Sequence, residues 1–214
     1  MKILFLVVLV LVCLVSGFAI ADDDGTTGSE NAFDRFHGYG TDAYGDAYLT
    51  TLFARDNGFA GNSFNVSALT PLTIVGFDCN LEVPSVSCDI FVYYKVGTAD
   101  GFEQNSGAWT LLGTDNVIPA GSNLPTHVDV GGLYMDTGDT VGLCIISSES
   151  NVEYTNGGPN TYTNADMSIT TLRGLSDGWP PSSVFAYRVW NGTVHYIYGT
   201  ALVRNTWGSI KSTF

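Results

Sequence analysis

Short runs of β-forming residues, each ended by turn-forming residues, occupy most of the chain after Ala47. Examples are "AYLTTLFA", "LTIVGFDCNL", "WTLLGTDNVI" and "THVDVGGL", with Gly, Asn, Asp or Pro between them. Strands of this length separated by turn signals are typical of β-sandwiches and barrels. No convincing helical period precedes the ten-residue tail. The pattern predicts an all-β domain with about eight to ten antiparallel strands.

The stretch Val86–Leu112 shows this organisation most clearly, as an apolar strand, a long loop with three glycines, and a second strand opened by Trp109. We expect the loop, residues 96–108, to shape the surface rather than to form an active site. One face of the first strand carries Asp89, Phe91, Tyr93 and Lys95, so a neighbouring loop or strand is expected to cover part of it. Further along, Asn191-Gly192 stands between β-formers and predicts a type I′ hairpin.

Three cysteines follow the N-terminal segment: Cys79, Cys88 and Cys144. Pairing the two strands around the first two cysteines with Cys79 opposite Cys88 makes every facing pair apolar. The other pairs in this register are Phe77 with Ile90, Val75 with Val92, and Leu81 with Val86. The register predicts a Cys79–Cys88 disulfide, with two buried thiols as the alternative. There is no CxxC spacing and no histidine near a cysteine, which argues against a zinc site.

The N-terminus has the pattern of a secretory signal: Lys2, the apolar run 3–15, and Ala19-Ile20-Ala21 before three aspartates. The predicted organisation is a signal peptide at 1–21, a flexible polar leader at 22–46, the β-sandwich domain at 47–204 and a tail at 205–214. The protein is therefore expected to be secreted, extracellular or on the cell surface. A retained anchor is the alternative, although the apolar run is short for a membrane span.

The charge balance narrows the possible partners. The chain carries 8 basic and 21 acidic residues, a net charge of −13, and loss of Lys2 with the signal would make it −14. Nucleic acid and anionic lipid require clustered Lys and Arg, so neither is an expected partner. The acidity serves solubility, with attraction of divalent cations as the alternative.

Several phrases together resemble a group of mostly uncharacterised bacterial secreted β-sandwich proteins, many of which end in C-terminal surface-sorting tails. The phrases are "FARDNGFAGNSFNVSAL", "TIVGFDCNL", "VYYKVGTADGFEQNSGAWTLLGT", "YTNADMSITTL" and "RVWNGTVHY". The resemblance covers about Leu49 to Tyr196. It implies a jelly-roll-like sandwich and an extracellular address, and it supplies no activity and no catalytic residues.

Catalysis is not expected from the residues. The three histidines are His37, His127 and His195, and no G-x-S-x-G motif occurs. His195, close to a strand end, is interpreted as a hydrogen-bonded structural residue. Two carboxylates that meet across a cleft would make a secreted glycoside hydrolase, which stays an alternative.

Calcium is the metal that the sequence favours, because it takes carboxylate, amide and carbonyl oxygens. The segment "NGGPNTYTNAD" offers Asn156, Asn160, Asn164 and Asp166. Ordinary Asx turns explain the same residues, and no other cofactor is expected.

Flat aromatic rings are the candidates for ligand binding, because sugars stack on them. The candidates are Trp109, Trp179, Tyr187 and Trp190, with Trp179 favoured since "DGWPP" places it in a rigid loop. Trp109 and Trp190 lie in predicted strands, where a core position is favoured over ligand binding.

The sequence therefore predicts a non-catalytic extracellular protein with a structural, adhesive or interaction role. A carbohydrate-binding module, with or without calcium, is the second hypothesis. A glycan or a cell-surface protein is the expected partner.

Overall fold

The computed structural model describes residues 47–82, 87–149 and 151–199, all of which belong to one compact unit. The predicted signal peptide, leader and tail lie outside the described residues. Within those residues the chain forms fifteen β-strands and a single 3₁₀ turn, η1 (Ser106–Ala108). Each pair of neighbouring, hydrogen-bonded strands is antiparallel, which confirms the all-β, antiparallel sandwich. The strands outnumber the expected eight to ten because several of them have only three or four residues.

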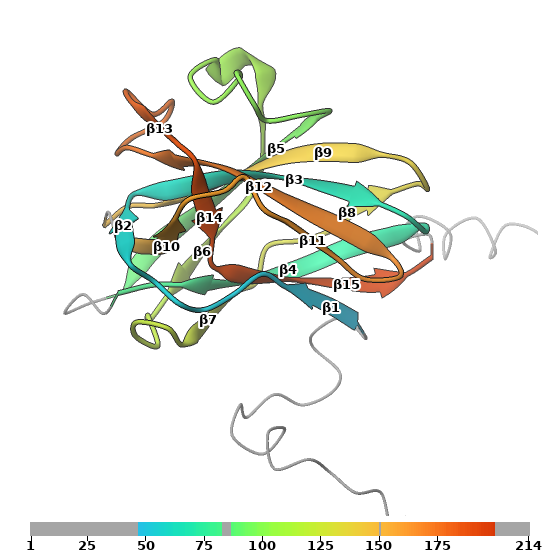
Figure 1. Cartoon of the computed structure of the whole chain (residues 1–214), viewed down its shortest axis with the longest axis horizontal. Coiled ribbons are helices and arrows are strands. Elements are labelled where there is room, and N and C mark those ends of the chain that lie inside the picture. The colour runs from blue at the N-terminus through green and yellow to red at the C-terminus, as the bar shows by residue number, and fades with distance from the viewer. Residues whose placement is uncertain (1–46, 83–86, 150, 200–214) are drawn as a thin grey trace, which may run out of the picture. The chain divides into compact units, whose positions relative to one another are not determined.

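Two large sheets face each other (Figure 1). One has the order β1 (Ala47–Thr50), β15 (Gly192–Tyr198), β4 (Leu72–Asn80) and β7 (Pro125–Val128), with β8 (Leu133–Met135) also paired to β4. The other has the order β11 (Thr161–Thr163), β12 (Met167–Leu175), β3 (Gly61–Ala68), β9 (Thr140–Ser147), β5 (Cys88–Val96) and β6 (Thr110–Val117), with β13 (Val184–Ala186) paired to β12. We call them the five-stranded and the seven-stranded sheet.

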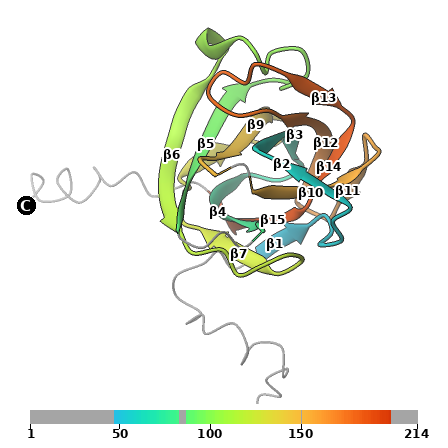
Figure 2. The ribbon, with the colours of Figure 1, turned by 90° about the vertical axis from the view of Figure 1, so that its left-hand side faces the viewer.

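A third, smaller sheet lies at one end of the sandwich (Figure 2). It consists of β14 (Arg188–Trp190), β10 (Val152–Asn156) and β2 (Asn57–Phe59). Its most important residue is Trp190, which is fully buried and stacks face to face on Phe64 of β3, with ring centroids 4.1 Å apart and an interplanar angle of 8°. This pair belongs to the main core, which fills the space between the two large sheets.

Alternating side chains build that core, because successive residues of a strand point to opposite faces. In β4, Leu72, Ile74, Phe77 and Cys79 are fully buried. Val75 is only half-buried, because a β-bulge shifts the register between Ile74 and Gly76 opposite β15. The bulge lets Ile74 and Phe77 both reach the core although three positions separate them. The predicted core position of Val75 is therefore wrong.

The predicted pairing of the two cysteine strands is also wrong. β4 pairs with β15, β7 and β8, whereas β5 pairs with β9 and β6 in the opposite sheet. Cys79 and Cys88 lie buried in the main core as free thiols, so the expected disulfide is not formed. An apolar strand face indicates which side is buried but not which strand is its neighbour. The same pattern therefore suits two strands that face each other across the core.

The predicted hairpin at Asn191-Gly192 is wrong for a related reason. β14 and β15 belong to different sheets, so these residues form a corner between sheets. A Cβ atom on Gly192 would collide with the Trp190 ring and with the carbonyl oxygen of Asp78. Glycine is required here by close packing and not by positive φ.

Candidate functional site

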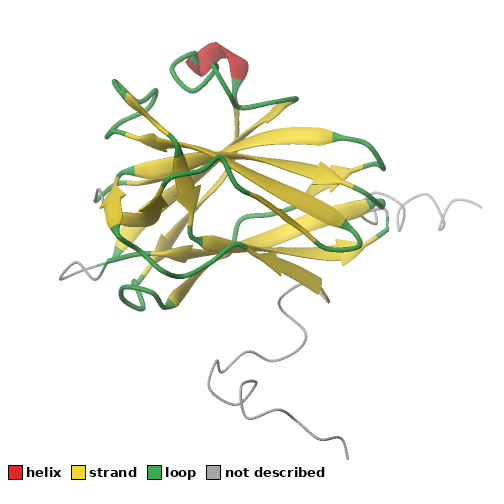
Figure 3. Ribbon diagram, viewed as in Figure 1, coloured by secondary structure: helices red, strands yellow, loops and turns green. Residues whose placement is uncertain are grey.

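Two loops cover the outer face of the seven-stranded sheet: residues 97–109, after β5, and residues 176–187, after β12 (Figure 3). Together we call them the loop cap. They pack over a second apolar cluster, in which Cys144, Ile146 and Leu175 are buried. Partly buried side chains complete this cluster: Tyr93, Trp109, Trp179 and Val184. The predicted cover over the Asp89–Lys95 face of β5 is therefore present.

Three aromatic rings order the cap. Trp179 stacks face to face on Tyr93 of β5, with centroids 3.7 Å apart and an interplanar angle of 7°. Trp109 meets Trp179 edge-on, at 5.9 Å and 81°. Offset-stacked and edge-to-face pairs are the favoured aromatic geometries, so Trp179 is held in a defined orientation. It nevertheless remains only half-buried.

Hydrogen bonds hold each loop in shape, and one of them joins the two loops. The Gln104 side chain donates to the carbonyl oxygen of Ser182 at 2.9 Å. The Trp109 indole N–H donates to the carbonyl oxygen of Phe102 at 2.9 Å. The Ser183 amide donates to Ser176 Oγ at 2.8 Å, which closes the loop that carries Trp179. Because such bonds fix the backbone on both sides of Trp179, its ring is a preorganised surface.

A groove of about 290 Å³ opens beside Trp179. We call it the aromatic groove, and its lining residues are Phe91, Tyr93, Ile146, Ser147, Ser148, Asp177, Gly178 and Trp179. Its volume lies just below the range of ligand pockets, which is about 300–1,000 Å³, and suits a small ligand. The groove combines aromatic walls with a carboxylate and a hydroxyl at the exposed rim, which suits one ring of an amphipathic ligand such as a sugar.

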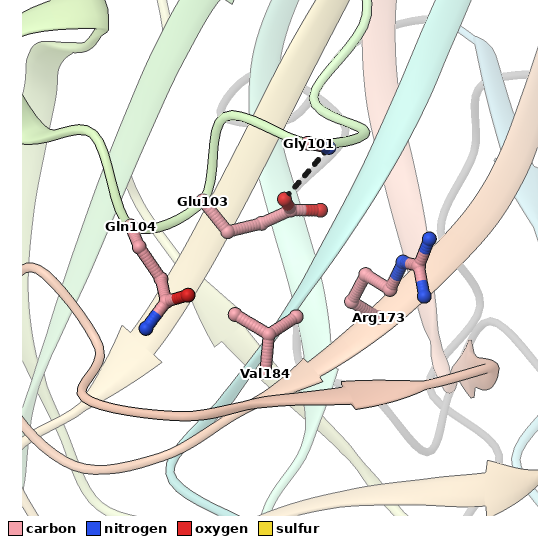
Figure 4. A pocket seen from close by; sticks show the side chains of 5 residues that line it. All are labelled: Gly101, Glu103, Gln104, Arg173 and Val184. Atoms are coloured by element: carbon pink, nitrogen blue, oxygen red, sulfur yellow. Dashed lines mark hydrogen bonds between the residues drawn. The ribbon is translucent and has the colours of Figure 1, made fainter.

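A second, polar pocket of about 240 Å³ lies in the same cap and is lined by Gly101, Glu103, Gln104, Arg173 and Val184 (Figure 4). The carboxylate of Glu103 is buried and accepts hydrogen bonds from the Gly101 amide and from Ser63 Oγ, both at 3.0 Å. Arg173 donates to Asp100 at 2.7 Å, and this hydrogen bond raises the pKa of the guanidinium. The pocket therefore presents fixed charges of both signs.

Three of the four aromatic candidates lie in the loop cap. Trp109 and Trp179 are in contact, and Tyr187 lies under the Arg173 guanidinium, 5.0 Å from its ring centroid. Trp190 is a correction: it is fully buried in the core and therefore presents no surface to a ligand.

The four residues predicted for calcium do not converge on one point. Asn156 accepts a hydrogen bond from Asn57, and Asn160 bonds Thr171 through its backbone. Asn164 and Asp166 do lie together, but both bond the Tyr196 hydroxyl at 2.8 Å. Asn164 Oδ1 also accepts from the Asp166 amide, which is the Asx turn that was the alternative. These residues fasten β15 to the turn before β12.

Sequence reasoning missed Phe91, Tyr93, Glu103 and Arg173 as members of the site. The amphipathic outer face of β5 was the available signal for the first two. No local signal marks the others, because Glu103 and Arg173 are brought together only by the pairing of β3 with β12 and by the fold of the loop.

Among the described residues no helix is long and apolar enough to cross a membrane. No protein-family model matches this chain, and a search of curated proteins finds no significant match. The likeness to secreted bacterial β-sandwich proteins therefore stays a prediction that rests on the quoted phrases. The candidate site is supported by its geometry.

Proposed function

We propose that this chain is a non-catalytic β-sandwich protein with an adhesive role outside the cell, and that it adheres by binding carbohydrate in the aromatic groove. The observation that carries the proposal is the half-buried Trp179, held by Tyr93 and Trp109 over a groove of ligand size. An aromatic ring fixed in advance loses little conformational entropy on binding, which favours recognition of a weakly hydrophobic sugar face.

The polar groups near the groove support this class of ligand. Asp177 and Ser148 line it and are exposed, so they can bond sugar hydroxyls. The other hydroxyl, that of Ser147, is buried and donates to Asn151. The Ser148 hydroxyl also takes part in a hydrogen bond, because it accepts from the Asp89 amide at 3.0 Å, but it is exposed and can bond a sugar hydroxyl as well.

The experiment is retention of the purified protein on a glycan array and on insoluble polysaccharides. We expect at least one glycan to retain the wild type, and Trp179→Ala to weaken binding about 30-fold, the effect of losing an aromatic contact worth about 2 kcal/mol. Tyr134→Ala is the matched control, because Tyr134 is an exposed aromatic residue on β8 of the other sheet. If no glycan retains the wild type, the carbohydrate-binding function is wrong.

Calcium assistance is tested in the same assay by adding a chelator. The predicted calcium residues Asn164 and Asp166 already bond Tyr196, so we expect glycan retention to survive calcium removal. Loss of retention with chelator, restored by Ca²⁺, would show a calcium-dependent lectin instead.

A secreted hydrolase is the competing function, and Glu103 is the carboxylate on which it would depend. This carboxylate is buried and bonded to Ser63 and Gly101, a setting that holds the loop in place. Any retained polysaccharide should therefore be recovered intact. Release of reducing sugar that Glu103→Gln abolishes would contradict the non-catalytic part of the proposal.

A further inference from the structure

Both described histidines meet at one carboxylate on the five-stranded sheet. Asp78 lies on the central strand β4, directly opposite His127 of β7. On the other side of β4, Thr193 of β15 pairs with Asp78 and His195 pairs with Gly76. Asp78 Oδ1 lies 3.0 Å from His127 Nδ1, and Asp78 Oδ2 lies 2.8 Å from His195 Nε2.

These groups lie on the outer face of the sheet, since the neighbours of Asp78 in β4, Phe77 and Cys79, point into the core. The side chains are 10–15% exposed: 14% for Asp78, 10% for His127 and 15% for His195. They are therefore shielded from competing water and still accessible to an ion.

Gly76 makes the space for the imidazole of His127. A Cβ atom at this position would lie 3.0 Å from Cε1 of His127. The rings of His127 and His195 approach to a centroid distance of 5.5 Å, at an interplanar angle of 63°. Tyr48 of β1 pairs with His195 of β15, and the centroids of their rings are 6.1 Å apart.

The donor set is that of a transition-metal site. One ligand atom from each of the three side chains can be chosen so that all lie within 4.8 Å of one another. Tetrahedral zinc sets its ligand atoms about 3.4 Å apart, so side-chain shifts on the order of 1 Å suffice. Two imidazole nitrogens and one carboxylate suit Zn²⁺ or a related first-row ion, whereas Ca²⁺ prefers oxygen ligands alone.

The carboxylate is ionised, as a ligand must be. Burial raises the pKa of Asp78, but hydrogen bonds from His127 and His195 outweigh that effect and lower it to about 2. An imidazole nitrogen that binds the ion cannot keep its proton, so each ring would bind as the tautomer that carries the proton on its other nitrogen.

We propose that Asp78, His127 and His195 bind one Zn²⁺ ion on the outer face of the five-stranded sheet. The ion links β7, β4 and β15, and its fourth coordination position is open to water or to a ligand from outside the chain. Sequence reasoning missed this site, because it sought histidines near cysteines and the three residues are far apart along the chain. Only the strand pairing brings them together.

The test is titration of the chelator-treated protein with Zn²⁺ by calorimetry. We expect one saturable site per chain, and a loss of affinity of about tenfold or more in His127→Gln and in His195→Gln. His37→Gln is the matched control, since it removes the remaining histidine of the chain and should leave the affinity unchanged. Circular dichroism confirms that each variant is folded, and visible absorption of the Co²⁺ form of the wild type reports the ligand geometry without any variant.

The site does not exist if the wild type shows no saturable Zn²⁺ binding. It is also wrong if His127→Gln and His195→Gln bind as tightly as the wild type, or if an excess of Ca²⁺ displaces the ion. Glycan retention by the loop cap is a separate measurement, so failure of either proposal leaves the other to be judged alone.

Discussion

Two tryptophans of this sandwich make almost the same contact and have different surroundings. Trp190 stacks on Phe64 at 4.1 Å and 8°, and Trp179 stacks on Tyr93 at 3.7 Å and 7°. The first pair lies between the two large sheets with no exposure, whereas Trp179 belongs to the loop cap and stays half-buried. Stacking geometry therefore does not separate a core tryptophan from a binding one. The difference is in what covers the ring.

Removal of the core tryptophan should have the largest effect on stability. Trp190→Ala should lower the free energy of unfolding by about 3–5 kcal/mol, because it opens a large cavity against Phe64. Urea denaturation monitored by circular dichroism measures this change. Trp190→Phe is the control, since it keeps an aromatic ring at the stack and should cost less. A loss below about 1 kcal/mol for Trp190→Ala would place this ring outside the cooperative core.

The corner next to Trp190 gives the next largest effect. Gly192→Ala should destabilise by about 1–3 kcal/mol, because the added methyl group collides with the Trp190 ring and with backbone that cannot move aside easily. Gly107→Ala is the matched control in the loop cap, where the new Cβ would touch only the Asn105 side chain at 3.6 Å. Equal thermal midpoints for the two variants would show that Trp190 is not tightly packed.

In the loop cap, removal of the stacked ring should cost far less stability. Trp179→Ala is expected to lower the free energy of unfolding by about 1–2 kcal/mol, which is about 0.5–1.5 kcal/mol for the aromatic pair plus a smaller area contribution from this half-buried ring. The same denaturation experiment compares it with Trp190→Ala. A cost as large as that of Trp190→Ala would make the cap part of the core.

The smallest effect concerns the link between the two loops. Gln104→Ala removes the hydrogen bond to Ser182 and should cost about 1 kcal/mol or less, since one neutral hydrogen bond is worth about that much. We expect faster amide exchange in residues 176–183 of this variant. Asn105→Ala is the control, because the Asn105 side chain makes no capping hydrogen bond to η1. Unchanged exchange would show that the loop holds its shape without Gln104.

Local pattern was enough to predict the β-sandwich and the cover over β5. Turn residues divide the chain into short strands, and the apolar outer face of β5 with Phe91 and Tyr93 requires a neighbour. Trp179, in the rigid loop "DGWPP", was correctly expected outside the core. The core position favoured for Trp190 is confirmed, whereas the hairpin after it is wrong, because a corner between two sheets and a hairpin share the same Asn-Gly signal.

Long-range pairing explains what the sequence could not reveal. Cys79 and Cys88 are close in sequence and belong to opposite sheets, whereas His127 and His195 are distant in sequence and meet at Asp78. The bulge at Val75 shifts the register of β4 against β15 by one residue, and the alternation of apolar residues in the sequence does not predict such a shift. Each of these features depends on which strand lies next to which.

The central claim is that Trp179 serves binding while Trp190 serves folding. The most direct test measures glycan retention and unfolding free energy together on Trp179→Ala, with wild type and Tyr134→Ala in parallel. We predict that retention falls about 30-fold in Trp179→Ala while its free energy of unfolding falls by about 1–2 kcal/mol and it stays folded at the assay temperature. Retention equal to that of the wild type in folded Trp179→Ala would contradict the claim.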